Sequence, residues 1–327
     1  GVHSNKWYHL GLEDIKRSTL SDAMKNRPYQ IYEGLFYKLL EKCRSHTPNH
    51  RFEFTNPLYS MDATVINLCL SVFPWAKYRQ MKGAIKLHYL YDHRGSLPSF
   101  MVMTDGKKSD IRVAKSEAKL DLHLLPDSII SVDRAYIDFE WLYSLDQRHV
   151  WFVTRAKTSM QYRIVGQHQP IDHPQVTRDD EIELIVEKTR KKYPKPFRLV
   201  CYTHPETKKV YTFITNNMTL PASTIAAIYK SRWQIELFFK WIKQNLKIKS
   251  FLGTSQNAVL SQIWVAMCYY LLLSYIKFQT KYSYSLQVLT RMIASVLMEQ
   301  RLLIDILSLD ERSLQKVRDP VAQLSLF

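Results

Sequence analysis

The order of strand-like and helix-like segments between residues 51 and 154 constrains the fold of this chain more than any other feature. Before residue 51 the apolar residues recur at helical spacing, whereas after it they form short strand-like runs bounded by turn residues. The predicted strands are 57–68, 83–91, 99–104, 128–132 and 150–154, and the predicted helices between them are 110–122 and 139–145. A chain with this order forms an α/β domain in which helices flank a mixed sheet.

Three antiparallel strands, a helix, a strand, a helix, a strand and a later helix form the order of a ribonuclease H-like fold. Many α/β domains match parts of this order, so by itself it is a weak signal. Residues 1–50 are expected to be a helical N-terminal segment, and residues 51–327 the main domain. Within the main domain we expect a β-rich insertion at about 156–220, with strands near 197–202 and 210–215, and C-terminal helices over about 222–327.

Composition favours a folded protein with a polyanionic partner. Of the 327 residues 46% are hydrophobic, which supports a core, and 46 Lys and Arg against 30 Asp and Glu give a formal charge of +16. Such an excess of basic charge favours nucleic acid, although some folded proteins are merely basic. The longest apolar run, 263–276, is shorter than the ~20 residues of a membrane span and is predicted to be a buried core helix.

The cysteines and histidines do not indicate a metal site or a disulfide framework. The four cysteines are scattered without paired spacing, as expected in a reducing compartment such as the cytoplasm. The eleven histidines include no HExxH motif. Any metal in this protein is therefore expected to bind to carboxylates.

A helix predicted over 229–247 carries one carboxylate among several hydrogen-bond donors. At 100° per residue its polar residues fall on one narrow face. They are Tyr229, Arg232, Glu236, Lys240, Lys243 and Lys247, and the adjoining apolar stripe is Ile235, Phe238, Phe239, Ile242 and Leu246. An ordinary amphipathic helix, with its charged face in solvent and its apolar stripe packed on the core, would explain this pattern equally well. A functional interpretation requires partners for Glu236.

Two aspartates in the predicted sheet are candidate partners. Asp62 interrupts an apolar strand, where a lone charge is unfavourable unless it is paired or binds a metal. Asp133 follows the strand 128–132, at the end where α/β sheets open onto their sites. Each residue also has a structural explanation, since Asp62 could lie at a frayed edge, Asp133 could cap a turn, and Glu236 could pair with Lys240 or Arg232. Asp92 and Asp105 lie beside turn glycines, and spacing alone does not decide between Asp62 and Asp105.

The spacing Tyr229-x2-Arg232-x3-Glu236-x6-Lys243 resembles the signature of the insertion-sequence family four transposases. These are DDE enzymes with a ribonuclease H-like fold. Further segments resemble the catalytic core of that family, and the resemblance extends from about residue 8 to residue 278. These segments are 61–76, 82–98, 104–110, 132–139 and 152–157.

The resemblance implies a cut-and-paste DNA transposase of an insertion sequence. By it, the catalytic and metal-binding triad is Asp62, Asp133 and Glu236, and Asp105 is a turn residue. One two-metal site with Mg²⁺ or Mn²⁺ would nick the element end, form and open a hairpin, and transfer the strand to target DNA. Double-stranded DNA, both transposon ends and target, is the implied partner. The implied location is the bacterial cytoplasm, at the nucleoid.

The resemblance also implies further DNA-binding residues and an assembly. Tyr229, Arg232 and Lys243 would hold phosphates of the DNA end, and we expect auxiliary phosphate contacts from Lys240 and Lys247, which lie outside the signature. Such enzymes act as homodimers in a synaptic complex, and the helices after Lys281 are the expected interface.

The chain departs from the family pattern in two ways. Relatives carry a tryptophan in the insertion that stacks on a flipped base, but this chain has none between Trp151 and Trp233. Tyr193, Phe197 and Tyr202 are alternatives among which the sequence does not choose. Relatives also carry an N-terminal DNA-binding domain, of which this chain is expected to hold at most the end.

Two other functions fit the same residues. A stand-alone nuclease of the same fold would cut DNA without joining it. A non-catalytic DNA-binding remnant or transposition inhibitor would bind DNA in a salt-dependent manner through its basic residues.

Overall fold

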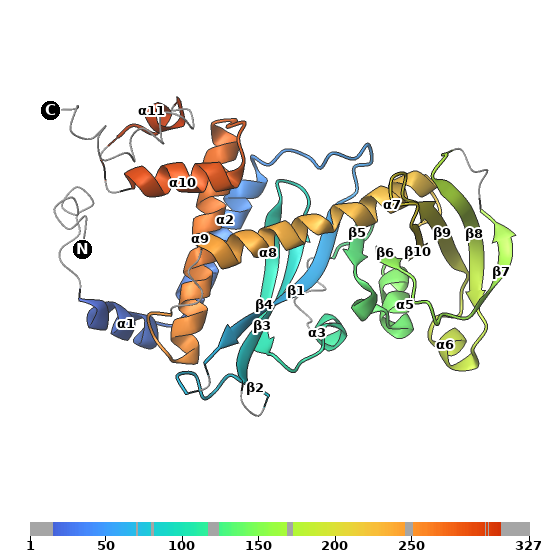
Figure 1. Ribbon diagram of the computed structural model, residues 1–327, viewed down its shortest axis with the longest axis horizontal. Helices are drawn as coiled ribbons and strands as arrows, with labels where there is room; N and C mark the ends of the chain where they lie inside the picture. The colour runs from blue at the N-terminus through green and yellow to red at the C-terminus, as the bar shows by residue number, and fades with distance from the viewer. Residues whose placement is uncertain are drawn as a thin grey trace. The chain divides into compact units, whose positions relative to one another are not determined.

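The computed structural model describes residues 16–69, 71–79, 82–116, 124–168, 173–245, 251–297, 299 and 301–308 (Figure 1). The chain divides into two compact units. The sheet unit is Pro48–Asn245, and the helical unit combines Gly1–Thr47 with Leu246–Phe327. The helical unit thus joins the C-terminal helices to the N-terminal ones, whereas the sequence grouped them with the sheet. The functional division into 1–50 and 51–327 stays a prediction.

The core of the sheet unit begins with antiparallel strands. β1 (Leu58–Leu68) pairs with β3 (Lys82–Asp92), which pairs with both β4 (Leu97–Asp105) and the short β2 (Lys77–Arg79).

Two further strands continue the sheet on the other side of β1. β5 (Ile129–Val132) pairs with β1, β6 (Trp151–Arg155) pairs with β5, and both pairings are parallel. The strands follow one another along the chain in the predicted order, three antiparallel and then two parallel ones, so the mixed α/β class with a ribonuclease H-like core is confirmed.

The β-rich insertion extends the same sheet. β10 (Val210–Thr215) pairs with β6, and β9 (Phe197–Thr203), β8 (Val176–Leu184) and β7 (Tyr162–Gln167) follow in that order. Together the described strands form one ten-stranded sheet. Within the β-rich insertion the sequence located two strands, which correspond to β9 and β10, and did not locate β7 and β8 individually. The strands β7 and β8 were missed because they are polar and contain no long run of apolar residues.

A buried ion pair explains the buried aspartate of β8. Asp179 and Arg198 are 3% and 0% exposed. The Nε and one terminal nitrogen of the Arg198 guanidinium each donate to the Asp179 carboxylate at 2.7 Å. The same guanidinium donates to the carbonyl oxygens of Asn217 and Leu220. These contacts satisfy a charged group inside the sheet unit and tie β8 and β9 to the loop that leads into the last helices.

We expect Asp179→Asn to lower the free energy of unfolding by about 3–5 kcal/mol, because it leaves the Arg198 charge buried without a counter-ion. The matched control is Glu183→Gln, since Glu183 pairs with Arg163 on the solvent-exposed side of the same sheet at 2.7 Å. Loss of an exposed pair changes stability by at most about 1 kcal/mol. Urea unfolding of both variants measures the difference, and equal losses would contradict this assignment.

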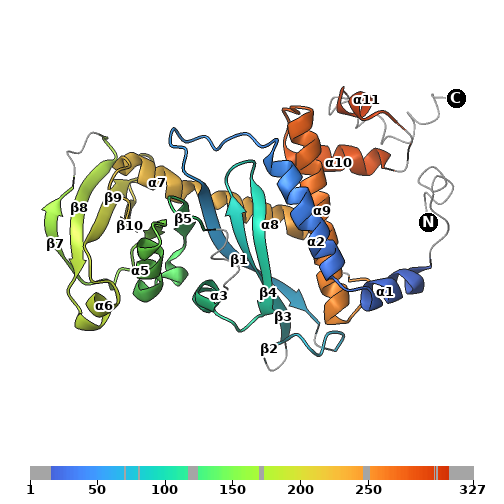
Figure 2. The same cartoon turned by 180° about the vertical axis from the view of Figure 1, so that it is seen from behind.

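Helices cover both faces of the sheet (Figures 1 and 2). On one face lies α5 (Phe139–Gln147), whose Trp141, Leu142 and Leu145 pack in a core with alternate residues of the strands. On the other face α7 (Ala222–Ser231) packs on the intervening strand residues, and α8 (Trp233–Asn245) continues from it across β1 and β3. Figure 2 shows α5 and α3 (Asp110–Ser116) in front of the sheet and α8 behind it. Residues 117–122 of the expected helix lie outside the described residues.

The smaller elements of the sheet unit are a single turn of 3-10 helix, η2 (Arg134–Tyr136), and α6 (Glu187–Lys192) in the insertion. The helical unit contains α1 (Arg17–Asn26), α2 (Gln30–Arg44), α9 (Gln256–Gln279), α10 (Leu286–Val296) and α11 (Leu303–Ser308). These positions agree with the helices expected at both ends of the chain.

The long helix α9 is the core of the helical unit. Phe36 of α2 packs against Trp264 of α9, with ring centroids 5.1 Å apart. Among the described helices, α9 alone is long and apolar enough to cross a membrane, but a buried core helix meets the same criterion. Since 67% of its most apolar window is buried, the structure agrees with the predicted core helix.

Candidate active site

Asp62 and Asp133 lie side by side where β1 and β5 run parallel. The register pairs Met61 with Val132, so the next residue along each chain segment is an aspartate. Paired residues of neighbouring strands point to the same face of a sheet. The structure therefore brings together two of the three predicted carboxylates, although Asp62 and Asp133 are 71 residues apart in the sequence.

Asp92 and Asp105, the two aspartates that the sequence assigned to turns, are found in turns, and the candidate Asp133 also caps one. Asp133 accepts a hydrogen bond from the Ala135 N–H at 2.6 Å and so caps the 3-10 turn that ends β5. Asp105 accepts from the N–H groups of Lys107 and Lys108 at 3.2 and 3.0 Å. Asp92, which is 1% exposed, accepts from the Arg94 N–H at 2.9 Å. Turn capping thus fully explains Asp105, whereas Asp133 both caps a turn and adjoins Asp62.

Asp62 lies in the interior of β1 rather than at a frayed edge. Its neighbours are Tyr89 on β3 and the β5 segment on the other side. Burial raises the pKa of Asp62 to about 6, and the negative charges of Asp133 and Glu236 act in the same direction. The Ala63 N–H and the Arg232 guanidinium oppose this rise. All three predicted carboxylates therefore interact electrostatically at one place.

Arg232 bridges the first and third carboxylates. One terminal nitrogen of its guanidinium lies 2.8 Å from Asp62 Oδ2, and the other lies 3.0 Å from Glu236 Oε1. The Arg232 side chain is only 13% exposed, and its Nε is buried without a hydrogen-bond partner among the described residues. The guanidinium carbon also lies 5.7 Å from the centre of the Tyr229 ring. A cation thus occupies the position on which Asp62 and Glu236 converge.

The apolar stripe of α8 fixes Glu236 above β1. Ile235, Phe238, Phe239 and Ile242 are buried, as the sequence predicted, and Leu246 lies outside the described residues. Phe238 contacts the rings of Tyr89 and Tyr91 at centroid distances of 5.2 and 5.6 Å. Tyr89 is the strand partner of Asp62, so these contacts position the helix over the aspartate.

The helix predicted over 229–247 is interrupted at Arg232. The helix α7 ends at Ser231 and α8 begins at Trp233, and the hydrogen bonds at the junction are of the i to i+3 type, Arg232 to Tyr229 and Ile235 to Arg232. The Ser231 hydroxyl donates to the Ile228 carbonyl at 2.7 Å, a local competition that bends helices. The predicted helix is therefore divided in two, although Arg232 keeps a helical backbone conformation and pairs with Glu236 four residues further on.

The polar residues of the two helices line two hollows. The carboxylate cleft, with a volume of about 590 Å³, is lined by Asp62, Ala63, Thr64, Val65, Glu236, Phe239, Lys240, Lys243 and Gln244. Lys240 and Lys243 are exposed there, next to the carboxylates. The position of Lys247 lies outside the described residues.

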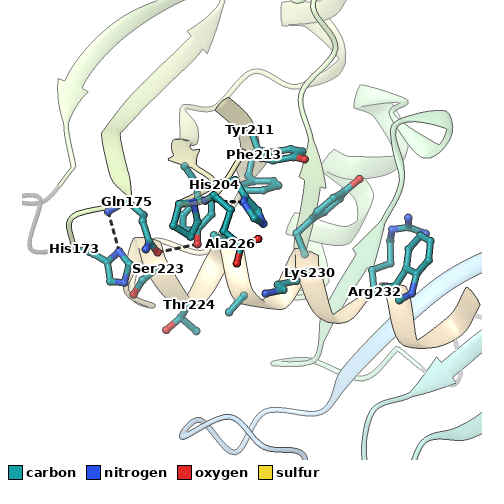
Figure 3. Close-up of a pocket in the computed structure, with 16 residues that line it drawn as sticks. His173, Gln175, His204, Tyr211, Phe213, Ser223, Thr224, Ala226, Lys230 and Arg232 are labelled. Carbon is teal, nitrogen blue, oxygen red and sulfur yellow. Dashed lines mark hydrogen bonds between the residues drawn. The ribbon is translucent and has the colours of Figure 1, made fainter. Parts of the chain in front are cut away.

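The second hollow, the aromatic cavity, has a volume of about 820 Å³ and contains Tyr229 and Arg232 in its lining (Figure 3). Figure 3 shows Tyr211 and Phe213 above α7, with Lys230 and Arg232 further along the helix. Trp233, which is 59% exposed, also lines the cavity. This hollow combines aromatic faces with basic side chains.

The structure separates the three aromatic residues that the sequence left open. Tyr193 and Phe197 are 2% and 1% exposed and belong to the core. Tyr202 lines the aromatic cavity, where its hydroxyl donates to Gln175 at 2.9 Å. Trp233 was not considered because it lies outside the insertion, although its place directly after Arg232 was a usable signal.

The carboxylates fit a divalent cation chemically, but their side chains are not arranged around one. Among the described residues no three His, Cys, Asp or Glu side chains are close enough to hold a metal ion. Asp62 and Glu236 already share a cationic partner in Arg232, and carboxylate oxygens are the ligands that Mg²⁺ and Mn²⁺ prefer. Binding of a metal by both groups requires the guanidinium to turn away.

Comparison with known proteins agrees with the sequence resemblance. The family model described as "Transposase DDE domain" matches residues 53–272. A probable transposase for insertion sequence element IS5377 from Geobacillus stearothermophilus is 30% identical over 276 residues, which cover 83% of this chain and 70% of that protein. The putative transposase y4zB from Sinorhizobium fredii is 32% identical over 257 residues, which cover 78% and 69%.

Among solved structures, a piggyBac transposase in a synaptic complex with hairpin DNA aligns with a TM-score of 0.45 and 10% identity. The alignment covers 84% of this chain and 56% of that chain.

Proposed function

Since this chain belongs to the family of DDE transposases, we propose that it moves an insertion sequence by cut-and-paste transposition with Asp62, Asp133 and Glu236 as its catalytic triad. The family acts on DNA with a divalent metal. The finer assignments are the use of Mg²⁺ or Mn²⁺ at a two-metal site, a hairpin intermediate, and a homodimer that joins two transposon ends before attack on target DNA.

One observation carries this proposal: three carboxylates from distant segments interact electrostatically at Asp62, and two of them, Asp62 and Glu236, line the carboxylate cleft. The parallel register places Asp133 beside Asp62, and Arg232 links Asp62 to Glu236. Isolated carboxylates in a sheet interior are unfavourable, and a common cationic partner explains their convergence. When bound, divalent cations would activate the attacking oxygen and stabilise the leaving oxygen. The three carboxylates would hold them.

The residues beside the triad are suited to binding phosphates. Lys240 and Lys243 are exposed in the carboxylate cleft, and Arg232 can exchange its carboxylate partners for a phosphate, which matches the guanidinium fork. Tyr229 is partly buried beside Arg232 and would direct the guanidinium. These residues would hold the DNA end so that its scissile phosphate lies over Asp62 and Glu236.

The aromatic cavity is proposed to receive a base displaced from the duplex. Tyr202 and Trp233 supply faces for stacking, which works with any base because every base has a π-face. Arg155 lies 4.9 Å from the Tyr211 ring centre and adds positive charge at the neighbouring strand. Trp233 is the stronger candidate because its side chain is largely exposed and directly follows Arg232.

The proposal is tested by incubating the purified protein with the end DNA of its own element and Mg²⁺. Nicked DNA, a hairpin product and strand transfer into a second duplex are the expected products in time order. Released ends that never join would identify a nuclease instead. Salt-dependent binding without any cleavage would identify a DNA-binding remnant.

Lys240→Ala is expected to weaken DNA binding and to reduce the slope of log affinity against log salt by about one, as for the loss of one phosphate contact. Nicking at saturating DNA should persist, because Lys240 does not contact the carboxylates in the described structure. Fluorescence anisotropy across a salt series measures the slope. Lys115→Ala serves as a control, since that ammonium is paired with Asp138 and Glu140. Loss of nicking with unchanged affinity would contradict this role.

A further inference from the structure

A buried histidine lies beside the site without a role in the chemistry described so far. His93 follows β3 and is 6% exposed. Its backbone N–H donates to the Leu58 carbonyl at 3.0 Å, which fixes it beside β1. Its ring packs against Tyr91 at a centroid distance of 5.5 Å, on the side where Tyr91 contacts Phe238 of α8.

The imidazole links the two segments that carry the first and third carboxylates. His93 Nε2 lies 2.7 Å from the Ser60 hydroxyl, and the ring also forms a hydrogen bond with the side chain of Gln234. Ser60 precedes Asp62 by two residues on β1, and Gln234 precedes Glu236 by two residues on α8. One side chain is thus bonded to both segments at the same distance along the chain from each carboxylate.

The state of the imidazole suits a fixed link. Burial lowers the pKa of His93 to about 4; the Gln234 hydrogen bond opposes this shift, and His50 adds to it. A neutral imidazole has one donor and one acceptor, and a hydroxyl and an amide can satisfy both. The Ser60 side chain is completely buried, so its hydrogen bond to His93 does not compete with bulk water.

This link matters most when Arg232 is engaged elsewhere. In the described structure Arg232 also connects α8 to β1, through Asp62. A guanidinium that binds a phosphate or makes room for a cation gives up this connection. The ring contacts of Phe238 and Phe239 then remain, but they are less directional than hydrogen bonds. The His93 link does not involve Arg232, so it would remain between the start of α8 and β1 in both situations.

We propose that His93 is a positioning residue that sets the spacing between Asp62 and Glu236 by bonding Ser60 and Gln234. It touches neither the DNA nor the reacting atoms, and it acts through the two segments that it joins. The inference rests on the proposed function, because the spacing matters only if these carboxylates bind a metal together.

The test measures Mn²⁺ binding to the DNA-free full chain by the electron paramagnetic resonance signal of free Mn²⁺. His93→Phe preserves most of the side-chain volume but removes the hydrogen bonds to Ser60 and Gln234. Gln234→Ala removes only the bond between His93 and Gln234, whose side chain is half-exposed. Each is expected to weaken Mn²⁺ binding about 10- to 100-fold, as for residues that orient metal ligands. Affinity for duplex DNA, measured by anisotropy without metal, should stay within about twofold of the starting protein, since neither residue binds phosphate in this proposal.

Two further variants separate positioning from general stability. His88→Phe is the matched control, because His88 is also buried on β3 but bonds Thr104 and pairs with Asp110 away from α8. It should lower the melting temperature without changing Mn²⁺ affinity. His93→Gln keeps an amide that donates and accepts, and should recover most of the affinity lost in His93→Phe. The double variant His93→Phe/Gln234→Ala should bind Mn²⁺ no more weakly than either single variant.

The outcomes also separate this inference from the proposed function. Mn²⁺ binding that Asp62→Asn abolishes, but that His93→Phe and Gln234→Ala leave unchanged, would overturn the positioning role alone. An equal loss in His88→Phe would likewise overturn it, in favour of a general effect of stability. Mn²⁺ binding that Asp62→Asn does not weaken would instead overturn the proposed metal site.

Discussion

Glu236→Gln is expected to abolish nicking, hairpin formation and strand transfer together, with a rate loss of at least about 10²–10³-fold. The reason is that one site is proposed to perform all steps, and the amide removes a charged ligand while preserving shape. DNA binding should remain, because Glu236 repels phosphates and contributes no attraction. Gel analysis of end DNA with Mg²⁺ measures each product, and anisotropy measures binding.

Asp105→Asn is the matched control for this prediction. Asp105 lies in a strand of the same sheet and was an alternative first aspartate by spacing, but its carboxylate accepts two backbone N–H groups in a turn. An asparagine oxygen can accept the same bonds, so activity should be retained. An active Glu236→Gln protein would overturn the triad, and an inactive Asp105→Asn protein would show that the turn residue takes part in the site.

Arg232→Gln is expected to tighten Mn²⁺ binding by the DNA-free protein about 10- to 100-fold, or about 1.4–2.8 kcal/mol. In the described structure the guanidinium bonds both Asp62 and Glu236, so it competes with a cation for the same oxygens. Two unit charges 4 Å apart near a protein surface repel by about 4 kcal/mol, so the expected gain is a part of that repulsion. Binding to end DNA should weaken in the same variant, because a phosphate partner is lost.

The effect of Arg232→Gln on Mn²⁺ binding depends on pH, because burial raises the pKa of the Asp62 carboxyl. The pKa of Asp62 is about 6, and Arg232 is one of the groups that lower it, so Arg232→Gln raises it further. Below this pKa the carboxyl is protonated and binds metal poorly. The gain in affinity should therefore be largest near pH 8 and should shrink as the pH approaches 6. Lys243→Gln removes one charge from the same cleft without freeing a carboxylate, and should give a smaller gain. Equal gains would show that charge alone is responsible.

The core strands were predictable because their residues are buried on both faces. Ile129 packs toward α7 while Ile130 and Val132 pack toward α5, so β5 appears in the sequence as an uninterrupted apolar run. The apolar stripe of α8 was equally clear, since its members recur at helical spacing and are buried. Such patterns depend on local periodicity, which a sequence displays directly.

The strands β7 and β8 were not predictable by the same means. Residues 163–165 of β7 are exposed, and β8 carries Asp179, whose charge is satisfied by Arg198 on the neighbouring strand. Without that partner an acidic run favours a solvated loop. The break at Arg232 was also hidden, because it depends on a Ser231 hydroxyl bond rather than on glycine or proline.

By itself the sequence determined the α/β class and the order of the core strands along the chain, because hydrophobic periodicity and turn residues are local properties, whereas the choice of Asp62 over Asp105 came from the family resemblance. Only the tertiary structure decided that Asp62 and Asp133 are neighbours, because strand register is a long-range property. It alone also showed that Arg232 bridges Asp62 to Glu236, and that His93 joins the segments before both carboxylates. Distances between side chains on separate segments follow from packing, which no periodicity along one segment encodes.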